Sequence, residues 1–165
     1  MNAVQKGRPR SDKARRAILN AAYTLLKSHS LLSITMDQIA QEAGVSKATL
    51  YRWWSNKLDV LVDAFVENSP PRKTTMEGDA PLAVLMAGFG DLLELLQGES
   101  GHVIADIIGH GRANPKAVEL FREKFLEPRR TIARKLVCEA QAAGDLDAAL
   151  DVEIALDMIF GPLYY

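Results

Sequence analysis

The chain has 165 residues, a net charge of −1 and 48% hydrophobic residues, which is enough for one domain or two small domains with a real core. No stretch of 18 apolar residues occurs, and the basic N-terminus does not lead into an apolar region, so we expect neither a membrane span nor a secretory leader. The single cysteine, Cys138, excludes an intrachain disulfide and suits a reducing cytoplasm.

The near-neutral total charge conceals two halves of opposite sign. Residues 1–73 contain 12 Lys and Arg against 6 Asp and Glu, whereas residues 74–165 contain 8 against 15. Binding to phosphates requires a local excess of positive charge, and counterion release makes such binding sensitive to salt. We therefore expect the first half to bind DNA and the acidic half to face away from it.

Residues 1–10 are interpreted as a basic N-terminal arm. Glycine and proline keep the Lys6-Gly7-Arg8-Pro9-Arg10 segment extended, so Arg8 and Arg10 can enter a narrow minor groove, where the potential is most negative. The alternative is a basic tail that only provides non-specific attraction. A helix is predicted after the arm, from about residue 12 to residue 28, with Ser11 as its cap.

Two short helices joined by a tight turn are predicted at about residues 34–53. Thr35 is a suitable N-cap for the first helix, because its hydroxyl can accept an amide hydrogen bond. Gly44 follows the last periodic residue, where the backbone must adopt a positive φ. Ser46 caps the second helix. The inward stripe of the first helix comprises Ile39, Ala40 and Ala43.

The second short helix, residues 47 to about 53, has one apolar and one polar face. Leu50 and one or both of Trp53 and Trp54 point inward. A helix-turn-helix of this kind places its second helix in the major groove of DNA. The face offered to the groove carries Lys47, Thr49, Tyr51 and Arg52.

In this register, with caps, turn glycine, Thr49-Leu50-Tyr51, an aromatic pair and Lys57, the segment resembles the DNA-binding domain of TetR-family transcriptional repressors. The resemblance extends over about residues 11–68. It departs from the family at Trp53-Trp54, where a tyrosine or histidine more often precedes a phenylalanine. The aromatic character is kept.

The resemblance implies a function for individual residues. Base edges or nearby phosphates are contacted from positions 47, 48, 49 and 52, Tyr51 meets the DNA backbone or a thymine methyl, and Lys57 clamps a phosphate at the start of the next helix. Ser55 or Asn56 caps that helix. The predicted DNA-binding residues are Arg8, Arg10, Thr35, Ser46, Lys47, Ala48, Thr49, Tyr51, Arg52, Trp53 and Lys57.

The remaining chain is predicted to be helical, which makes the fold class all-α: an N-terminal three-helix helix-turn-helix domain (residues 11–71) and a C-terminal helical bundle for ligand binding and dimerisation (residues 76–165). A breaker-rich link joins the two. Pro128 should kink or divide a helix, and Gly144 should end one. The expected helices are residues 57–67, 80–97, 102–112, a helix opened by Pro115 with Asn114 as cap, 129–143, and one from about 151.

Residues 114–165 are similar to the regulatory domain of one TetR subgroup, which implies an effector cavity and a dimer face. Tyr165 falls in the middle of an apolar helical pattern, so we expect the chain to be truncated. The apolar candidates for the pocket, each of which is alternatively plain core, are Met86, Phe89, Phe121, Phe125, Cys138 and Met158. The polar candidates, which alternatively form a solvated polar face, are His102, Asp106 and His110. The stripe expected to be part core and part dimer face is Val152, Ala155, Leu156, Ile159, Phe160 and Leu163.

His102, Asp106 and His110 share one helix face and could supply metal ligands, but Gly109 and Gly111 weaken that helix and no cysteine is near. We expect no metal, no cofactor and no enzyme. The leading hypothesis is a homodimeric repressor that binds a palindromic double-stranded DNA operator and responds to a small-molecule effector. The alternatives are a helical protein-interaction module whose basic half meets an acidic protein or membrane surface, and a metal-sensing repressor.

Overall fold

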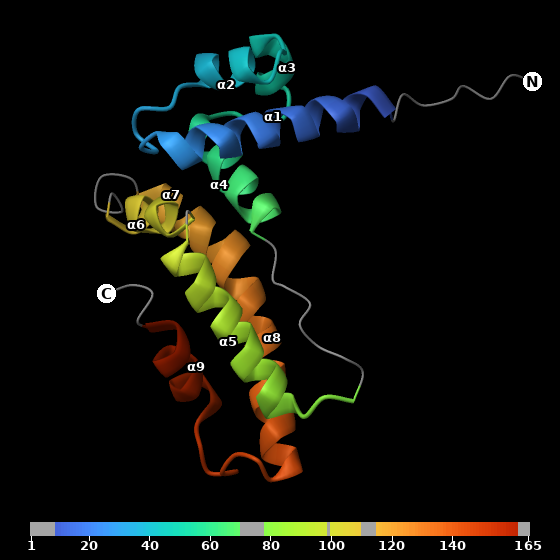
Figure 1. The fold of residues 1–165 in the computed structure, drawn as a ribbon, viewed down its shortest axis with the longest axis vertical. Coiled ribbons are helices and arrows are strands. Elements are labelled where there is room, and N and C mark those ends of the chain that lie inside the picture. The colour runs from blue at the N-terminus through green and yellow to red at the C-terminus, as the bar shows by residue number, and fades with distance from the viewer. Residues whose placement is uncertain (1–8, 70–77, 99, 110–114, 162–165) are drawn as a thin grey trace, which may run out of the picture. The chain divides into compact units, whose positions relative to one another are not determined.

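The computed structural model describes residues 9–69, 78–98, 100–109 and 115–161, and this described part contains helices and no strands. The chain divides into two compact units, Met1–Asn68 and Ser69–Tyr165. Figure 1 shows an all-α architecture, as predicted. The arm residue Arg8 lies outside the described residues.

The first unit consists of α1 (Pro9–Ser28), α2 (Met36–Glu42), α3 (Lys47–Tyr51) and α4 (Lys57–Asn68). Helix α1 packs against α4 and α2, and α2 packs against α3. Apolar residues at helical spacing meet inside this unit and provide most of its stability, because removing apolar surface from water is the dominant favourable term in folding. The fully buried side chains include Ile18, Leu19, Leu26, Ile39, Leu50, Leu61 and Phe65.

Two boundaries in this unit differ from the prediction. Helix α1 begins at Pro9, so Ser11 and Arg10 lie within the helix, and both the Ser11 cap and the extended conformation at position 10 are wrong. Proline is tolerated in the first turn of a helix, since its missing N–H would be unpaired there. Helix α3 ends at Tyr51 rather than near Trp53, because the N–H of Trp53 turns back to the carbonyl of Leu50 at 3.0 Å.

The second unit consists of α5 (Pro81–Gln97), α6 (Gly101–Gly109), α7 (Pro115–Phe121), the π-helical segment η1 (Arg122–Leu126), α8 (Glu127–Ala143) and α9 (Val152–Phe160). Helices α5 and α8 lie side by side, α9 packs on α8, and α6 joins α5 to α7. The expected Asn114 cap lies outside the described residues. The buried core includes Leu85, Leu92, Val103, Ile104, Ile107, Phe121, Phe125, Val137, Leu156 and Phe160.

The sequence predicts a kink or a division at Pro128, and the structure has a π-helical segment, η1, between the α-helices directly before this residue. Helices α7 and α8 are continuous through η1, where the N–H of Glu127 donates to the carbonyl of Arg122, five residues back. Proline at position 128 has no N–H for the carbonyl four residues before it, and its ring would clash with that group in a regular helix. A π segment widens the helix just before the proline, so the backbone stays helical up to α8.

The junction of α5 and α6 depends on Gly101. A Cβ at this position would lie 1.8 Å from the carbonyl oxygen of Leu96, so only glycine fits. No single described helix is long and apolar enough to cross a membrane. Helices α5 and α6 together have the required length and composition, but they are bent by 78° at the break between them.

Candidate nucleic-acid interface

Helix α2 is fixed at its start by a reciprocal pair of hydrogen bonds. The Oγ1 of Thr35 accepts from the N–H of Gln38 at 3.2 Å, and the Oε1 of Gln38 accepts from the N–H of Thr35 at 2.8 Å. This capping box satisfies two backbone donors that the helix itself cannot. The position of Thr35 was predicted from sequence. In the structure its side chain orients α2.

The turn after α2 is held by backbone hydrogen bonds around Gly44. The N–H of Gly44 donates to Gln41 at 3.1 Å, and the N–H of Val45 donates to Ala40 at 3.0 Å. Gly44 has φ of +63°, which glycine adopts without a Cβ clash. This pair of bonds is a Schellman motif, and it sets the direction in which the chain enters α3.

Helix α3 offers one side to solvent and anchors the other. Ser46 caps it, with its Oγ 3.2 Å from the N–H of Thr49 and 2.9 Å from the Thr49 Oγ1. Leu50 is fully buried against the unit's core. Because the helix has only five residues, the cap and this one apolar anchor must fix its orientation. The exposed side carries Ser46, Lys47, Ala48, Tyr51, Arg52 and Trp53, with Thr49 half-buried.

The structure resolves the open choice between the two tryptophans. Trp54 is the inward residue, 5% exposed, and its Nε1–H donates to the Oδ2 of Asp63 at 2.8 Å. Trp53 is 37% exposed and lies beside Trp54, with ring centroids 6.2 Å apart. Trp53 is thus free to contact a ligand of the unit, whereas Trp54 links α3 to α4.

Lys47, the first residue of α3, is held by an acidic residue of α2. Its Nζ lies 2.7 Å from the Oδ2 of Asp37, and both side chains are well exposed. The Asp37 carboxylate raises the pKa of Lys47 through this hydrogen bond. Binding of Lys47 to a phosphate would compete with Asp37.

Lys57, the predicted phosphate clamp, has backbone partners in the structure. Its Nζ donates to the carbonyls of Ile34 at 2.9 Å, Leu32 at 2.7 Å and Leu31 at 3.2 Å. Partial burial lowers its pKa. An ammonium has three donors, so all are used here. Lys57 therefore ties the α1–α2 loop to the start of α4, and a phosphate contact would have to replace one of these bonds.

The start of α4 is capped by Asn56, one of the two predicted residues. Its Oδ1 accepts from the N–H of Asp59 at 3.1 Å, and its Nδ2 donates to the Asp59 carboxylate at 2.7 Å. The Ser55 hydroxyl donates to the same carboxylate at 3.2 Å. Both polar residues thus organise this helix end, and Asn56 is the backbone cap.

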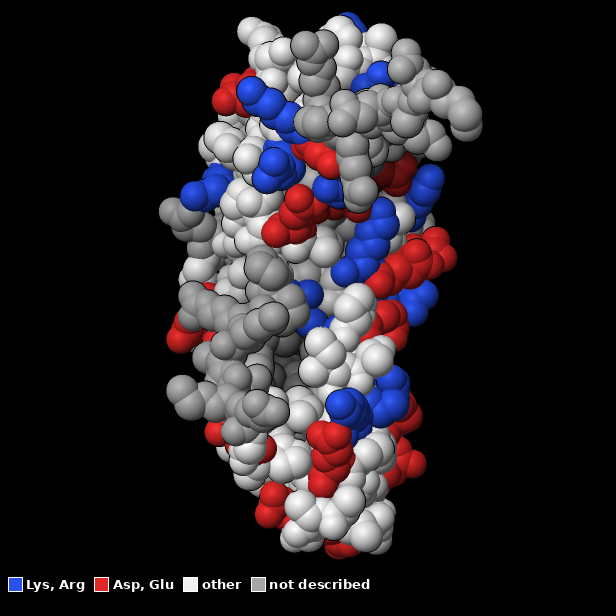
Figure 2. Space-filling model, turned by 90° about the vertical axis from the view of Figure 1, so that its right-hand side faces the viewer, with Lys and Arg blue, Asp and Glu red and all other residues white. Residues whose placement is uncertain are grey.

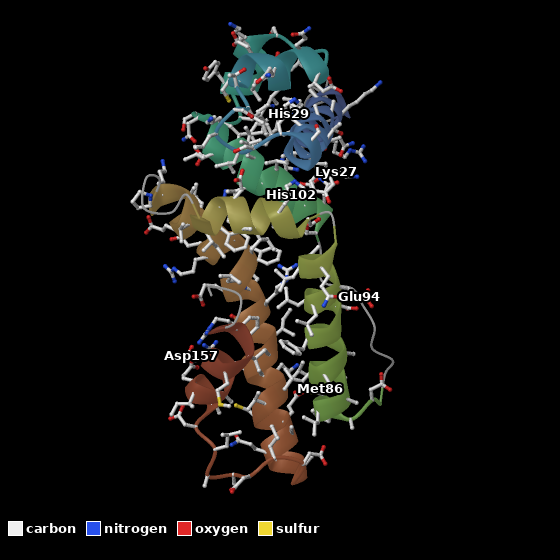
Figure 3. All side chains as sticks on the ribbon, turned by 60° about the vertical axis from the view of Figure 1, so that its left-hand side comes forward. Lys27, His29, Met86, Glu94, His102 and Asp157 are labelled. Atoms are coloured by element: carbon white, nitrogen blue, oxygen red, sulfur yellow. The ribbon has the colours of Figure 1, made fainter. Side chains whose placement is uncertain are left out.

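The candidate pocket residues of the second unit do not converge. Phe121 and Phe125 are core residues, buried and stacked with centroids 4.8 Å apart. Met86 and Met158 are 60% and 73% exposed. In Figure 3, Met86 lies toward the beginning of α5, whereas His102 lies on α6 beyond the other end of α5. Of the rest, Phe89 and Asp106 are half-buried, His102 and Cys138 are exposed, and His110 lies outside the described residues.

The described residues contain no group of three or more His, Cys, Asp or Glu that could hold a metal ion. Because His110 is outside the described part, the expected trio with His102 and Asp106 is not seen as a whole.

The stripe on α9, predicted to be part core and part dimer face, contributes two residues to the core of its own unit. Leu156 is fully buried and Phe160 is 4% exposed, and the Arg130 guanidinium lies 5.8 Å from the Phe160 ring centroid. Val152, Ala155 and Ile159 are half-buried, and Leu163 lies outside the described residues. The exposed apolar residues of α9 are instead Ile154 and Met158, one turn apart, a pair that helical periodicity alone does not single out.

Charged residues of both signs meet at the surface. Figure 2 shows Lys and Arg side chains beside Asp and Glu side chains over the face drawn. Arg15 pairs with Glu67 at 2.9 Å, so part of the positive charge of the first unit is neutralised locally. Arg52 is exposed, and among the described residues no carboxylate pairs with it.

Comparison with known proteins gives a consistent result for both units. The family model for bacterial regulatory proteins of the tetR family matches residues 18–64, and the model for the tetracyclin repressor-like C-terminal domain matches residues 82–165. The uncharacterized HTH-type transcriptional regulator YdeS of Bacillus subtilis is 37% identical over 161 residues, which are 98% of this chain and 81% of that protein.

Solved structures agree with these matches. The TetR family transcription regulator SCO0332 superposes with a TM-score of 0.71 at 26% identity, over 92% of this chain and 84% of its own. The transcriptional regulator FadR from Bacillus subtilis, solved in complex with stearoyl-CoA, gives a TM-score of 0.72 at 23% identity, over 90% of this chain and 82% of its own.

Proposed function

The chain belongs to the TetR family of bacterial regulatory proteins, and on this premise we propose that it is a homodimeric repressor that a small-molecule effector releases from a palindromic operator. Family membership makes it a transcriptional regulator with an N-terminal helix-turn-helix DNA-binding domain. Repression, dimerisation and the response to an effector are what we propose beyond this.

The exposed side of α3 is the observation that carries the proposal. Two exposed hydrogen-bonding residues, Tyr51 and the C-cap Arg52, lie at the end of α3, whose direction is fixed by the Ser46 cap and the buried Leu50. A short helix of this kind reads only a few base pairs. Two copies related by a two-fold axis would read half-sites about 34–36 Å apart, or a variant of that spacing.

The second copy is proposed to pack on the exposed apolar side of α9. Ile154 and Met158 are 58% and 73% exposed and lie one turn apart. Replacing either with a charged residue would place that charge in the interface. Sedimentation of Met158→Glu should therefore show a monomer where the parent chain is a dimer, and an unchanged mass would remove α9 from the proposed interface.

The effector is proposed to act by shifting a conformational equilibrium. FadR of Bacillus subtilis was solved with stearoyl-CoA, so a protein of this fold can bind a small molecule. An effector that binds the form unable to engage both half-sites more tightly will lower the population of the DNA-binding form.

A band-shift assay with the DNA upstream of the chain's own gene tests the proposal. Tyr51→Ala and Arg52→Ala should each weaken binding about ten- to a hundredfold, as expected when one well-placed side chain no longer meets the DNA. Lys135→Ala, which removes an exposed cation of α8, is the matched control and should bind normally. Equal binding to unrelated DNA that neither substitution weakens would support the interaction-module alternative instead.

A further inference from the structure

Arg129, near the start of α8, is a half-buried arginine whose hydrogen-bond partners are backbone carbonyls. Its Nη1 donates to the carbonyl of Phe125 at 2.9 Å, and its Nη2 donates to the carbonyl of Ser69. The guanidinium carbon lies 3.7 Å from the centroid of the Phe125 ring, which stacks in turn on Phe121. The cation is therefore held against an aromatic stack on one face of the helix.

The charge of Arg129 has no counter-ion among the described residues. Neighbouring arginines each have one: Arg122 pairs with Glu127 at 3.0 Å, and Arg130 pairs with Asp157 at 2.9 Å. Burial alone lowers the pKa of Arg129 to about 10. Removing a cation from water costs free energy unless an anion compensates its charge. A bound anion would therefore stabilise Arg129 at this position.

Ser69 brings a second unsatisfied donor to the same place. The residue is 3% exposed, and its Oγ is a buried polar atom with no hydrogen-bond partner within the described structure. Its own carbonyl is the acceptor for the Arg129 Nη2. Buried polar atoms in folded proteins are nearly always paired, and an exception calls for a missing partner. Arginine has five N–H donors, of which carbonyls occupy two here.

We propose that Arg129 and Ser69 bind the anionic head group, a carboxylate or a phosphate, of a small molecule with an apolar body. Guanidinium groups and hydroxyls match the oxygens of both head groups, and charge-assisted bonds of this kind are among the strongest in proteins. We infer the apolar body from the half-buried position of the cation. An anion that reaches this cation loses part of its hydration, and burial of an apolar group attached to the anion offsets that free-energy cost. This inference rests on the proposed function in one respect, that the molecule is the effector.

The place of Ser69 in the chain gives such binding a route to the DNA-binding unit. Ser69 directly follows Asn68, the last residue of α4. An anion that takes the Nη2–H of Arg129 competes with the Ser69 carbonyl for this donor. Loss of the bond from Arg129 to the Ser69 carbonyl releases the chain directly after α4. A ligand that binds more tightly when this bond is broken would therefore couple the two units.

Isothermal titration of the full chain with matched eight-carbon ligands tests the site directly. Octanoate and octyl phosphate carry the two candidate head groups, and 1-octanol is the neutral control with the same chain. We expect at least one anion to bind at least tenfold more tightly than the alcohol, and the tighter of the two identifies the head group. Binding of neither anion, or equal binding of the alcohol, overturns the proposal.

Two variants and one control locate the binding. Arg129→Met keeps the length of the side chain but not its charge, and should weaken the anion about ten- to a hundredfold. Ser69→Ala removes an unpaired buried hydroxyl, so it should weaken the anion while leaving the thermal midpoint equal or higher. Arg122→Met, on the same continuous helix, should bind normally. Unchanged affinity in Ser69→Ala and Arg129→Met overturns the site even if the control behaves as expected.

A band shift with the tighter anion separates this inference from the proposed function. The anion should release the parent chain from its operator and should fail to release Ser69→Ala at the same concentration. If the ligand-free chain does not retain the operator, the proposed function fails while the titration still tests the site. If the chain retains the operator and a titrated anion does not release it, the assignment of this site to the effector is overturned.

Discussion

Adjacent and chemically identical, Trp53 and Trp54 have different structural surroundings. The indole of Trp54 is buried and donates to Asp63 on α4, whereas that of Trp53 is partly in solvent. Trp54→Phe removes that hydrogen bond and some buried volume, so we expect the free energy of unfolding to fall by about 1–3 kcal/mol. Trp53→Phe should change it by less than about 0.5 kcal/mol. Urea denaturation measures both, and equal losses would contradict the different roles.

Lys57 can be tested for its two candidate roles in one variant. Lys57→Met removes three donors from the carbonyls of the α1–α2 loop, and we expect it to cost about 1–3 kcal/mol of stability in urea unfolding. DNA binding should fall as a consequence, because the loop leads directly to the cap of α2. If Lys57 acted only on phosphate, stability would stay constant and only DNA affinity would fall. Lys47→Met, whose partner is exposed, is the control and should have little effect on stability.

Among the secondary-structure elements, the sequence predicted those features that depend only on residues close to one another in the chain. Thr35, Gly44, Ser46 and Asp151 begin or end helices as expected, because caps and positive φ act within a few residues. The π segment before Pro128 was not predicted. A proline disfavours a regular α-helix in the turn before it, but it does not determine whether the chain kinks, breaks or forms a π segment.

The candidate sites show the same limit more strongly. The exposed residues of α3 follow from a single short helix, so their exposure could be predicted. The partners of Lys57 are 23 to 26 residues away, and one of the two partners of Arg129, Ser69, is 60 residues away. No local pattern encodes such contacts. Nor does periodicity say which residues of the α9 stripe pack inward: Leu156 and Phe160 are buried, whereas Val152, Ala155 and Ile159 are half-buried.

Helices α8 and α9 are joined by ion pairs that respond to acid. Arg134 donates to Glu153 at 2.6 Å, Arg130 donates to it at 3.2 Å, and these bonds hold the pKa of Glu153 below its ordinary value of 4.5. A lowered pKa in the folded state stabilises the fold above the unfolded value, and that contribution is lost as pH falls through the folded value. The carboxylate is at the surface, so the effect is modest.

Glu153→Gln should therefore lower the thermal midpoint at neutral pH. The difference from the parent chain should shrink as pH falls below the ordinary value of 4.5, because the carboxylate is protonated as pH falls through its lowered folded-state pKa. Circular dichroism melts across the range measure it. Glu139→Gln is the control: Glu139 lies 3.6 Å from Lys135 within α8 and joins no second helix. A pH-independent difference would exclude the ion pairs as its cause.

Over the whole molecule, the net charge of −1 hides the split that matters for DNA binding. The first 73 residues hold 12 Lys and Arg against 6 Asp and Glu, yet Lys47 and Arg15 are paired with carboxylates in the structure. The charge available for phosphates is therefore smaller than the count implies. Arg52, exposed and without such a partner among the described residues, should contribute fully.

Salt dependence of operator affinity measures this directly. The slope of log K against log salt concentration becomes shallower by about 1 for each phosphate that the protein no longer neutralises, so Arg52→Ala should reduce it by about 1 if Arg52 binds a phosphate. Lys47 must leave Asp37 to reach a phosphate, and Asp37→Asn removes that competition. We expect Asp37→Asn to raise affinity for operator and for unrelated DNA by a similar factor, because freed positive charge carries no sequence information. Lys135→Ala, in the acidic half, should leave slope and affinity unchanged. A gain confined to the operator would instead mean that Lys47 reads a base edge and that Asp37 restrains it from doing so.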